Sequence, residues 1–249
     1  MILAIAKREL RGLFYSPLAW SLIAVVQLTL AWLFMIQLEE YLQFQSELIT
    51  LDNAPGITDL IVAPLIDSAA VLLLLITPLL SMRLISEELR SHTFGFLLSA
   101  PVSMSQIVLC KYLALLILFS IIWLLTALMP LSLLAGGNID LGRTAAGLLG
   151  LWLLAAAFAA IGLFFSSLTR QPAVAAVSSY GLLLFLWIIN LSGSSDRSSG
   201  LFDWLSLSAH FRRLTSGLVN SSYLLFYLLL AIGFLALTIK HLDGYRTQG

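Results

Sequence analysis

Residues 112–139 read YLALLILFSIIWLLTALMPLSLLAGGNI, a run without a single charged side chain. A helix needs about 20 mainly apolar residues to cross the hydrocarbon core of a bilayer, so this run is long enough for one membrane span. Four other charge-free segments, and one interrupted only by Asp67, have comparable lengths. The sequence therefore predicts six membrane helices. They are expected at residues 18–38, 61–82, 113–135, 144–168, 173–192 and 221–239.

The composition agrees with a membrane protein. Hydrophobic residues make up 60% of the chain and charged residues 10%, against about 25% charged residues in soluble domains. Lys plus Arg equal Asp plus Glu, so the net charge gives no indication of a nucleic acid partner. The single cysteine, Cys110, excludes an internal disulfide and a cysteine-rich metal site.

The distribution of Lys and Arg predicts the orientation. With both termini in the cytoplasm, nine basic residues lie on the cytoplasmic side and four on the outer side, which satisfies the positive-inside rule. We therefore expect a multi-pass membrane protein with both termini on the cytoplasmic side. The nine are Lys7, Arg8, Arg11, Arg83, Arg90, Lys111, Arg170, Lys240 and Arg246; the four are Arg143, Arg197, Arg212 and Arg213.

Residues 83–111, RLISEELRSHTFGFLLSAPVSMSQIVLCK, form the densest cytoplasmic concentration of charge between two apolar blocks. The pattern predicts a short amphipathic helix, a turn at Pro101 and then the start of the next helix. We call residues 83–111 the coupling stretch.

Two further segments are amphipathic. Residues 2–15 place Leu3, Ala6, Leu10 and Leu13 on one face and Lys7, Arg8 and Arg11 on the other. This suits a helix lying at anionic headgroups, although a simple basic flank before the first span fits as well. Residues 201–218 repeat apolar side chains every three or four positions, which predicts a helix lying on the outer leaflet. Those side chains are Trp204, Leu207, Phe211, Leu214 and Leu218.

Asp67 is the one ionisable residue inside an expected span. A carboxylate at that depth is a candidate intramembrane polar site, but one that reaches back to the outer interface explains it equally well. The segment Gly137–Thr144 resembles a phosphate-binding loop, yet it carries Arg where Lys is required, follows no strand and is expected outside the cell. We therefore expect no nucleotide site, no catalytic site and no metal site in this chain, and ATP must be handled by another subunit.

The coupling stretch carries a family resemblance. The run Ser86–Thr93, the run Leu97–Ser103 and the downstream Lys111 resemble the signature of ABC-2 type transporter permeases. In that family the segment is the coupling helix that docks in a groove of the ATPase subunit. The resemblance implies that this chain docks its ATPase through an apolar ridge, flanking charges and two motif positions. The ridge is Phe94, Leu97 and Leu98, the charges are Glu87, Glu88 and Arg90, and the motif positions are Thr93 and Pro101.

Two other regions narrow the resemblance. Residues 7–20 look like the amphipathic elbow helix of gliding-motility-type permeases, and residues 210–227 are similar to the end of the same group. The chain departs from the family at His92, where Gly is favoured, and at Phe94-Gly95, where an acidic residue is common. Asn220–Ser222 replaces a region that usually carries charges.

The resemblance implies one all-α transmembrane domain over residues 1–249, with the fold of a type-2 ABC exporter. Two such halves, identical or related, would assemble with two ATPase subunits that bind ATP and Mg. An auxiliary protein with a periplasmic domain is a further expected partner, besides membrane lipid. The alternatives are a membrane anchor that passes ATPase work to periplasmic partners without transport, an ion-coupled carrier that uses Asp67 and, more remotely, an intramembrane enzyme. The substrate is unidentified.

Overall fold

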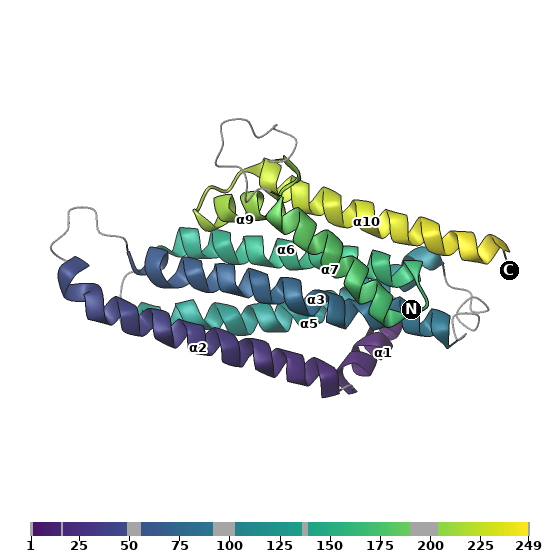
Figure 1. Ribbon diagram of the computed structural model, residues 1–249, viewed down its shortest axis with the longest axis horizontal. Coiled ribbons are helices and arrows are strands. Elements are labelled where there is room, and N and C mark those ends of the chain that lie inside the picture. The colour runs from purple at the N-terminus through teal and green to yellow at the C-terminus, as the bar shows by residue number, and fades with distance from the viewer. Residues whose placement is uncertain are drawn as a thin grey trace.

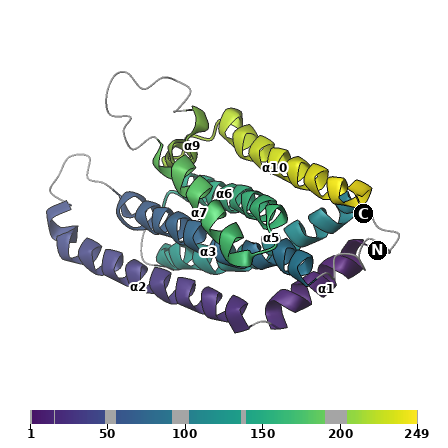
Figure 2. The same ribbon diagram turned by 45° about the vertical axis from the view of Figure 1, so that its right-hand side comes forward.

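The computed structural model describes residues 2–15, 17–48, 56–91, 103–135, 139–189 and 204–248, and every secondary-structure element in these ranges is helical. The long helices run back and forth along one axis, so that both termini lie at the same end of the bundle (Figure 1). We call this the terminal end and the opposite one the far end. The turned view in Figure 2 shows the N-terminal helix, α1 Ile2–Tyr15, at the lower edge of the terminal end, where it meets the next helix at a bend.

The N-terminal helix is present where it was expected, as α1 Ile2–Tyr15. It is followed by α2 Pro17–Leu48, and the bend between them is held by Trp20, whose Nε1 donates to the carbonyl oxygen of Phe14 at 2.9 Å. The polar residues after position 38 were expected to form a loop outside the bilayer. This is wrong for residues 39–48, because α2 continues to Leu48. Glu, Gln and Leu are strong helix formers, so the helix continues beyond the apolar segment.

The second span enters through a π-helical turn, η1 Thr58–Val62, and continues as α3 Ala63–Arg90. Pro64 lies in the first turn of α3, directly after this π-helical turn. Pro78 lies inside the helix. A separate amphipathic helix was expected to begin at Arg83. Instead, residues 83–90 are the last turns of α3. Residues 92–102 of the coupling stretch lie outside the described residues.

The remaining helices follow the expected order. They are α5 Met104–Ser132, extended by η2 Leu133–Ala135, then α6 Leu141–Leu168, α7 Pro172–Ile188, α9 Leu207–Thr215 and α10 Ser221–Gln248. A capping box at Ser103 starts α5: its Oγ accepts from the backbone N–H of Gln106 at 3.3 Å, and the Gln106 side chain accepts from the backbone N–H of Ser103. Because α5 starts at Met104, the coupling stretch ends inside this helix. The turn expected at Gly136–Asn138 lies outside the described residues.

Five helical segments among the described residues are long and apolar enough to cross a membrane. They are Pro17–Gln45, Thr58–Arg90, Met104–Ala135, Leu141–Leu168 and Ser221–Gly244. The shorter apolar helix α7, with 17 residues, measures about 26 Å at 1.5 Å per residue, less than the roughly 30 Å of a hydrocarbon core. The described part of the chain is thus all-helical, with five helices that could span a membrane by this measure, and the remaining expected span, residues 173–192, is described only to residue 189.

Helix α6 is the centre of the bundle and packs against α3, α5, α7, α9 and α10. Its glycines allow close approach: a Cβ on Gly162 would lie 2.2 Å from Ser81 Oγ of α3, and one on Gly150 would lie 3.1 Å from Leu214 Cβ of α9. The span at residues 144–168 is rich in alanine and glycine, and these small residues were expected to pack it closely against the next span, which corresponds to α7. The two helices do pack together, but these glycines face α3 and α9.

The helix expected on the outer leaflet packs onto protein instead. Leu207, Phe211 and Leu214 of α9 are fully buried, and α9 contacts α6 and α7. Of the apolar positions predicted for its lipid-facing side, Trp204 and Leu218 are exposed. An amphipathic repeat shows that one face avoids water, but not whether lipid or protein covers it; here protein covers the face formed by Leu207, Phe211 and Leu214.

Candidate functional site

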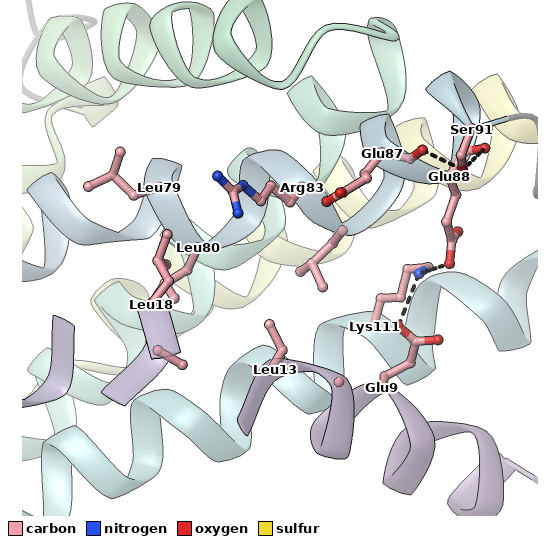
Figure 3. A pocket seen from close by; sticks show the side chains of 13 residues that line it. Glu9, Leu13, Leu18, Leu79, Leu80, Arg83, Glu87, Glu88, Ser91 and Lys111 are labelled. Carbon is pink, nitrogen blue, oxygen red and sulfur yellow. Dashed lines mark hydrogen bonds and ion pairs between the residues drawn. The ribbon is translucent and has the colours of Figure 1, made fainter. Parts of the chain in front are cut away.

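Lys111 connects three helices at the terminal end. Its side chain is only 2% exposed, and its Nζ donates to Glu88 Oε1 of α3 at 2.7 Å and to Glu9 Oε2 of α1 at 3.1 Å (Figure 3). A buried ammonium is costly unless charged partners replace its water, and here two carboxylates do so. We call Glu9, Glu88 and Lys111 the Lys111 cluster.

Local structure explains why Lys111 points inward. The cap at Ser103 starts α5 at Met104, and Lys111 lies two turns along the same face. Met104 and Ile107 on that face are buried. The family motif contains Lys111, but the sequence analysis predicted no site role for Lys111 or for Glu9. A lysine on the apolar face of a helix was the signal that could have identified this cluster.

The predicted docking residues differ in their surroundings in the structure. Glu88 belongs to the Lys111 cluster, whereas Glu87 and Arg90 are exposed on the last turns of α3. Thr93, Phe94, Leu97, Leu98 and Pro101 lie outside the described residues. Lys7 and Arg8 lie on α1, and the side chain of Arg11 is exposed there.

A cavity of about 470 Å³ lies beside the Lys111 cluster, between α1, α2 and α3. Figure 3 shows Glu9, Glu88 and Lys111 gathered at one side of it, and Leu13, Leu18 and Leu80 at the other. The cavity therefore has a charged wall and an apolar wall. It gives the clamped helices room to shift relative to one another.

A second, open hollow of about 990 Å³ lies between the last turns of α3 and the turn that joins α6 to α7. Arg83, Glu87 and Ser91 line both hollows. The end of α3, which leads into residues 92–102, is therefore flanked by open space on two sides.

The far end has its own charged contact. The guanidinium group of Arg143 on α6 pairs with Asp59 of η1, and its Nε donates to the carbonyl oxygen of Thr215 on α9 at 3.1 Å. Asp140 caps α6 by accepting from the backbone N–H of Arg143. Arg143, the residue that made this segment resemble a phosphate-binding loop, thus joins three elements of the protein.

Asp67, the candidate intramembrane polar site, is exposed on α3 in the half of the helix nearer the far end. None of the ion pairs among the described residues involves Asp67.

Comparison with known proteins identifies the family. The family model described as "ABC-2 family transporter protein" matches residues 3–243. No relative among curated proteins matches the chain. The match covers nearly the whole chain and agrees with the apolar helices described above. This chain therefore belongs to the ABC-2 family of transporter proteins, as a multi-pass membrane subunit.

Proposed function

We propose that this chain is the membrane subunit through which a separate ABC ATPase moves a substrate across a bacterial inner membrane. The coupling stretch, Arg83–Lys111, is where the ATPase docks and delivers motion. In this proposal two ATPase subunits bind ATP and Mg, a second permease half completes the membrane part, and both termini are cytoplasmic. The same proposal includes a sixth span at residues 173–192 and an interfacial elbow role for α1. It also includes membership of the gliding-motility-type subfamily and an auxiliary periplasmic protein.

The observation that carries this proposal is the Lys111 cluster. It joins the last turns of α3, which begin the coupling stretch, to the first turns of α5, which end it. Glu9 adds α1 to the same contact. Because both described ends of the stretch meet at Lys111, a displacement of the segment between them is passed to three helices together.

The exposed charges at the end of α3 are suited to fix the position of a bound ATPase. Glu87 and Arg90 are exposed, and Glu87 faces both hollows. The family resemblance adds Phe94, Leu97 and Leu98 as the apolar ridge, with Thr93 and Pro101 as motif positions. A docking surface of this kind combines apolar contact area with charges that fix the register.

Docking is tested by the double variant Phe94→Asp/Leu97→Asp. It should release the ATPase from membranes, as measured by co-purification with the tagged permease. A matched control places the same charges on exposed apolar positions of the far end, Trp204→Asp/Leu218→Asp, and should retain the ATPase. Unchanged co-purification of the first variant, at equal membrane yield, would contradict the docking assignment.

Coupling is tested separately in the Lys111→Met/Glu9→Gln/Glu88→Gln variant, which removes the charges and keeps similar side-chain sizes. It should still bind the ATPase, but candidate amphiphilic substrates should no longer change ATP hydrolysis in liposomes. The Arg143→Gln/Asp59→Asn variant at the far end is the control. Normal stimulation in the cluster variant would show that the cluster has no role in coupling.

The same liposomes separate the alternatives. Stimulation by an auxiliary periplasmic protein alone, without substrate, would favour the non-transporting anchor. Transport that survives removal of the ATPase but fails in Asp67→Asn would favour an ion-coupled carrier. Substrate-dependent ATP hydrolysis that is normal in Asp67→Asn is the outcome expected for an ATP-driven transporter.

A further inference from the structure

Three arginines from two separate parts of the chain converge on the hollow between α3 and the α6–α7 turn. Arg83 and Arg90 come from the last two turns of α3, and Arg170 comes from the turn before α7. Among the described residues that line the hollow, Glu87 is the only acidic one. Three guanidinium groups and one carboxylate give a formal charge of +2, so the hollow favours an anion.

These arginines are available for a ligand within the described part of the chain. All three side chains are exposed, and none of the three guanidinium groups forms an ion pair with another described residue. Glu88, the neighbouring carboxylate on α3, is instead directed to Lys111 (Figure 3). The terminal end thus holds a lysine paired with two carboxylates and, among the described residues, three exposed arginines that form no ion pair.

The hollow is continuous with a surface suited to lipid. Gln171, Pro172 and Ala173 line it, and they form the first turn of the 17-residue helix α7, whose N-terminus carries the positive end of the helix dipole. One turn further, Val174 is 50% exposed and Val177 is 70% exposed. A molecule with an anionic head and an apolar tail would place its head in the hollow and its tail along α7.

We propose that this hollow binds the phosphate head group of an anionic phospholipid of the inner leaflet, through Arg83, Arg90 and Arg170. This inference uses the orientation in the proposed function, which places the terminal end at the cytoplasmic leaflet, where anionic lipids attract basic residues. It does not depend on an ATPase. A lipid bound here touches the end of α3 and the start of α7, so lipid composition would bias the helix that leads into the coupling stretch.

The test uses the purified full chain in nanodiscs of phosphatidylglycerol or of phosphatidylcholine with the same acyl chains. After transfer to mild detergent, native mass spectrometry counts the retained lipids. The wild-type chain should retain phosphatidylglycerol but not phosphatidylcholine. The Arg83→Gln/Arg170→Gln variant, which leaves the proposed docking charge Arg90 in place, should bind phosphatidylglycerol about 30-fold more weakly, because each basic side chain near an anionic lipid contributes about a factor of five.

Two variants make the test specific. Arg212→Gln/Arg213→Gln removes the same number of charges from exposed positions on α9 and should retain phosphatidylglycerol like the wild-type chain. Arg83→Lys/Arg170→Lys keeps the charge and should recover most of the binding. Size-exclusion profiles identify any variant that misfolds, and the wild-type comparison between the two lipids remains decisive in that case.

Several outcomes would overturn the inference. Equal retention of both lipids by the wild-type chain, or undiminished phosphatidylglycerol binding in Arg83→Gln/Arg170→Gln, would contradict a head-group site. Displacement of the lipid by inorganic phosphate at similar concentration would identify a soluble anion as the ligand. If the variant kept its lipid and lost ATPase co-purification, the arginines would be a docking surface for protein. Loss of lipid with normal ATPase binding supports the lipid site whether or not the coupling proposal holds.

Discussion

The two ends of the bundle each hold a charged contact, but the contacts differ in burial. At the terminal end, Lys111 is 2% exposed and its partners Glu9 and Glu88 are 13% and 20% exposed. At the far end, Arg143 is 27% exposed and Asp59 is 40% exposed. Both contacts join three elements that are distant in the sequence. Water is largely excluded from one and reaches the other.

This difference predicts unequal energetic roles. An exposed ion pair is worth about 0–1 kcal/mol, because water solvates its charges almost as well when they separate. Breaking a buried one leaves a charge without water or partner, which costs about 3–5 kcal/mol. The terminal end is therefore a place where helices must move together or lose stability. The far end allows its elements to separate at little cost.

The largest expected effect comes from Lys111→Met, which leaves the two carboxylates facing each other without their cation. We expect the free energy of unfolding to fall by about 3–5 kcal/mol, measured by unfolding in detergent micelles. Adding Glu9→Gln and Glu88→Gln to the same chain should recover most of that loss, because the charges are then gone together. A triple variant no more stable than Lys111→Met would refute the buried-charge explanation.

The next effect concerns close packing, which holds the ends together through α3 and α6. Gly162→Ala would place a methyl group 2.2 Å from Ser81 Oγ, so the two helices must shift apart. We expect a loss of about 1–3 kcal/mol by the same unfolding measurement. Gly233→Ala on α10 meets nothing within 4 Å and should be neutral or slightly stabilising. Equal behaviour of the two variants would mean that the α3–α6 contact is looser than described.

Helix caps sharpen the comparison, because a side chain caps α5 at the terminal end and another caps α6 at the far end. Ser103→Ala removes the cap of α5 at the terminal end, and Asp140→Ala removes the cap of α6 at the far end. Each should cost about 1 kcal/mol. Similar losses would show that the two ends differ in buried charge and not in helix capping, whereas a much larger loss for Ser103→Ala would assign part of the difference to the cap.

The smallest effect is expected at the far end. Arg143→Gln/Asp59→Asn removes the exposed pair and should change the free energy of unfolding by less than about 1 kcal/mol. The change should shrink further as salt is raised, since exposed charges are screened. A loss as large as that of Lys111→Met would remove the distinction between the two ends.

Helix positions were predicted well where charge and hydropathy alone decide them. Helices cover the expected apolar segments, and the first helix was predicted to the residue at 2–15. Helix ends were predicted less well, because polar residues with high helix propensity continue α2 to Leu48 and α3 to Arg90. Hydropathy marks where a chain can lie in lipid, but a helix ends where its hydrogen bonding ends.

The candidate site was predicted in part. The sequence pointed to Glu87, Glu88 and Arg90 as one charged group, yet the structure divides them: Glu88 is bound to Lys111, while Glu87 and Arg90 are exposed. Neighbouring residues on a helix point in directions about 100° apart, so their partners depend on which helices lie alongside. The pairing of Glu9 with Lys111 spans 102 positions in the chain, and no local pattern contains it.

By itself, the sequence determined that this protein is a helical membrane protein of the ABC-2 type. Long apolar segments must form helices in lipid, since every backbone polar group needs a partner within its own segment. Only the tertiary structure decided how those helices meet. It assigned Lys111 two carboxylates from distant helices, turned the apolar face of α9 toward protein and left three arginines open beside α7. Burial and pairing depend on neighbours in space, and spacing along the chain does not specify them.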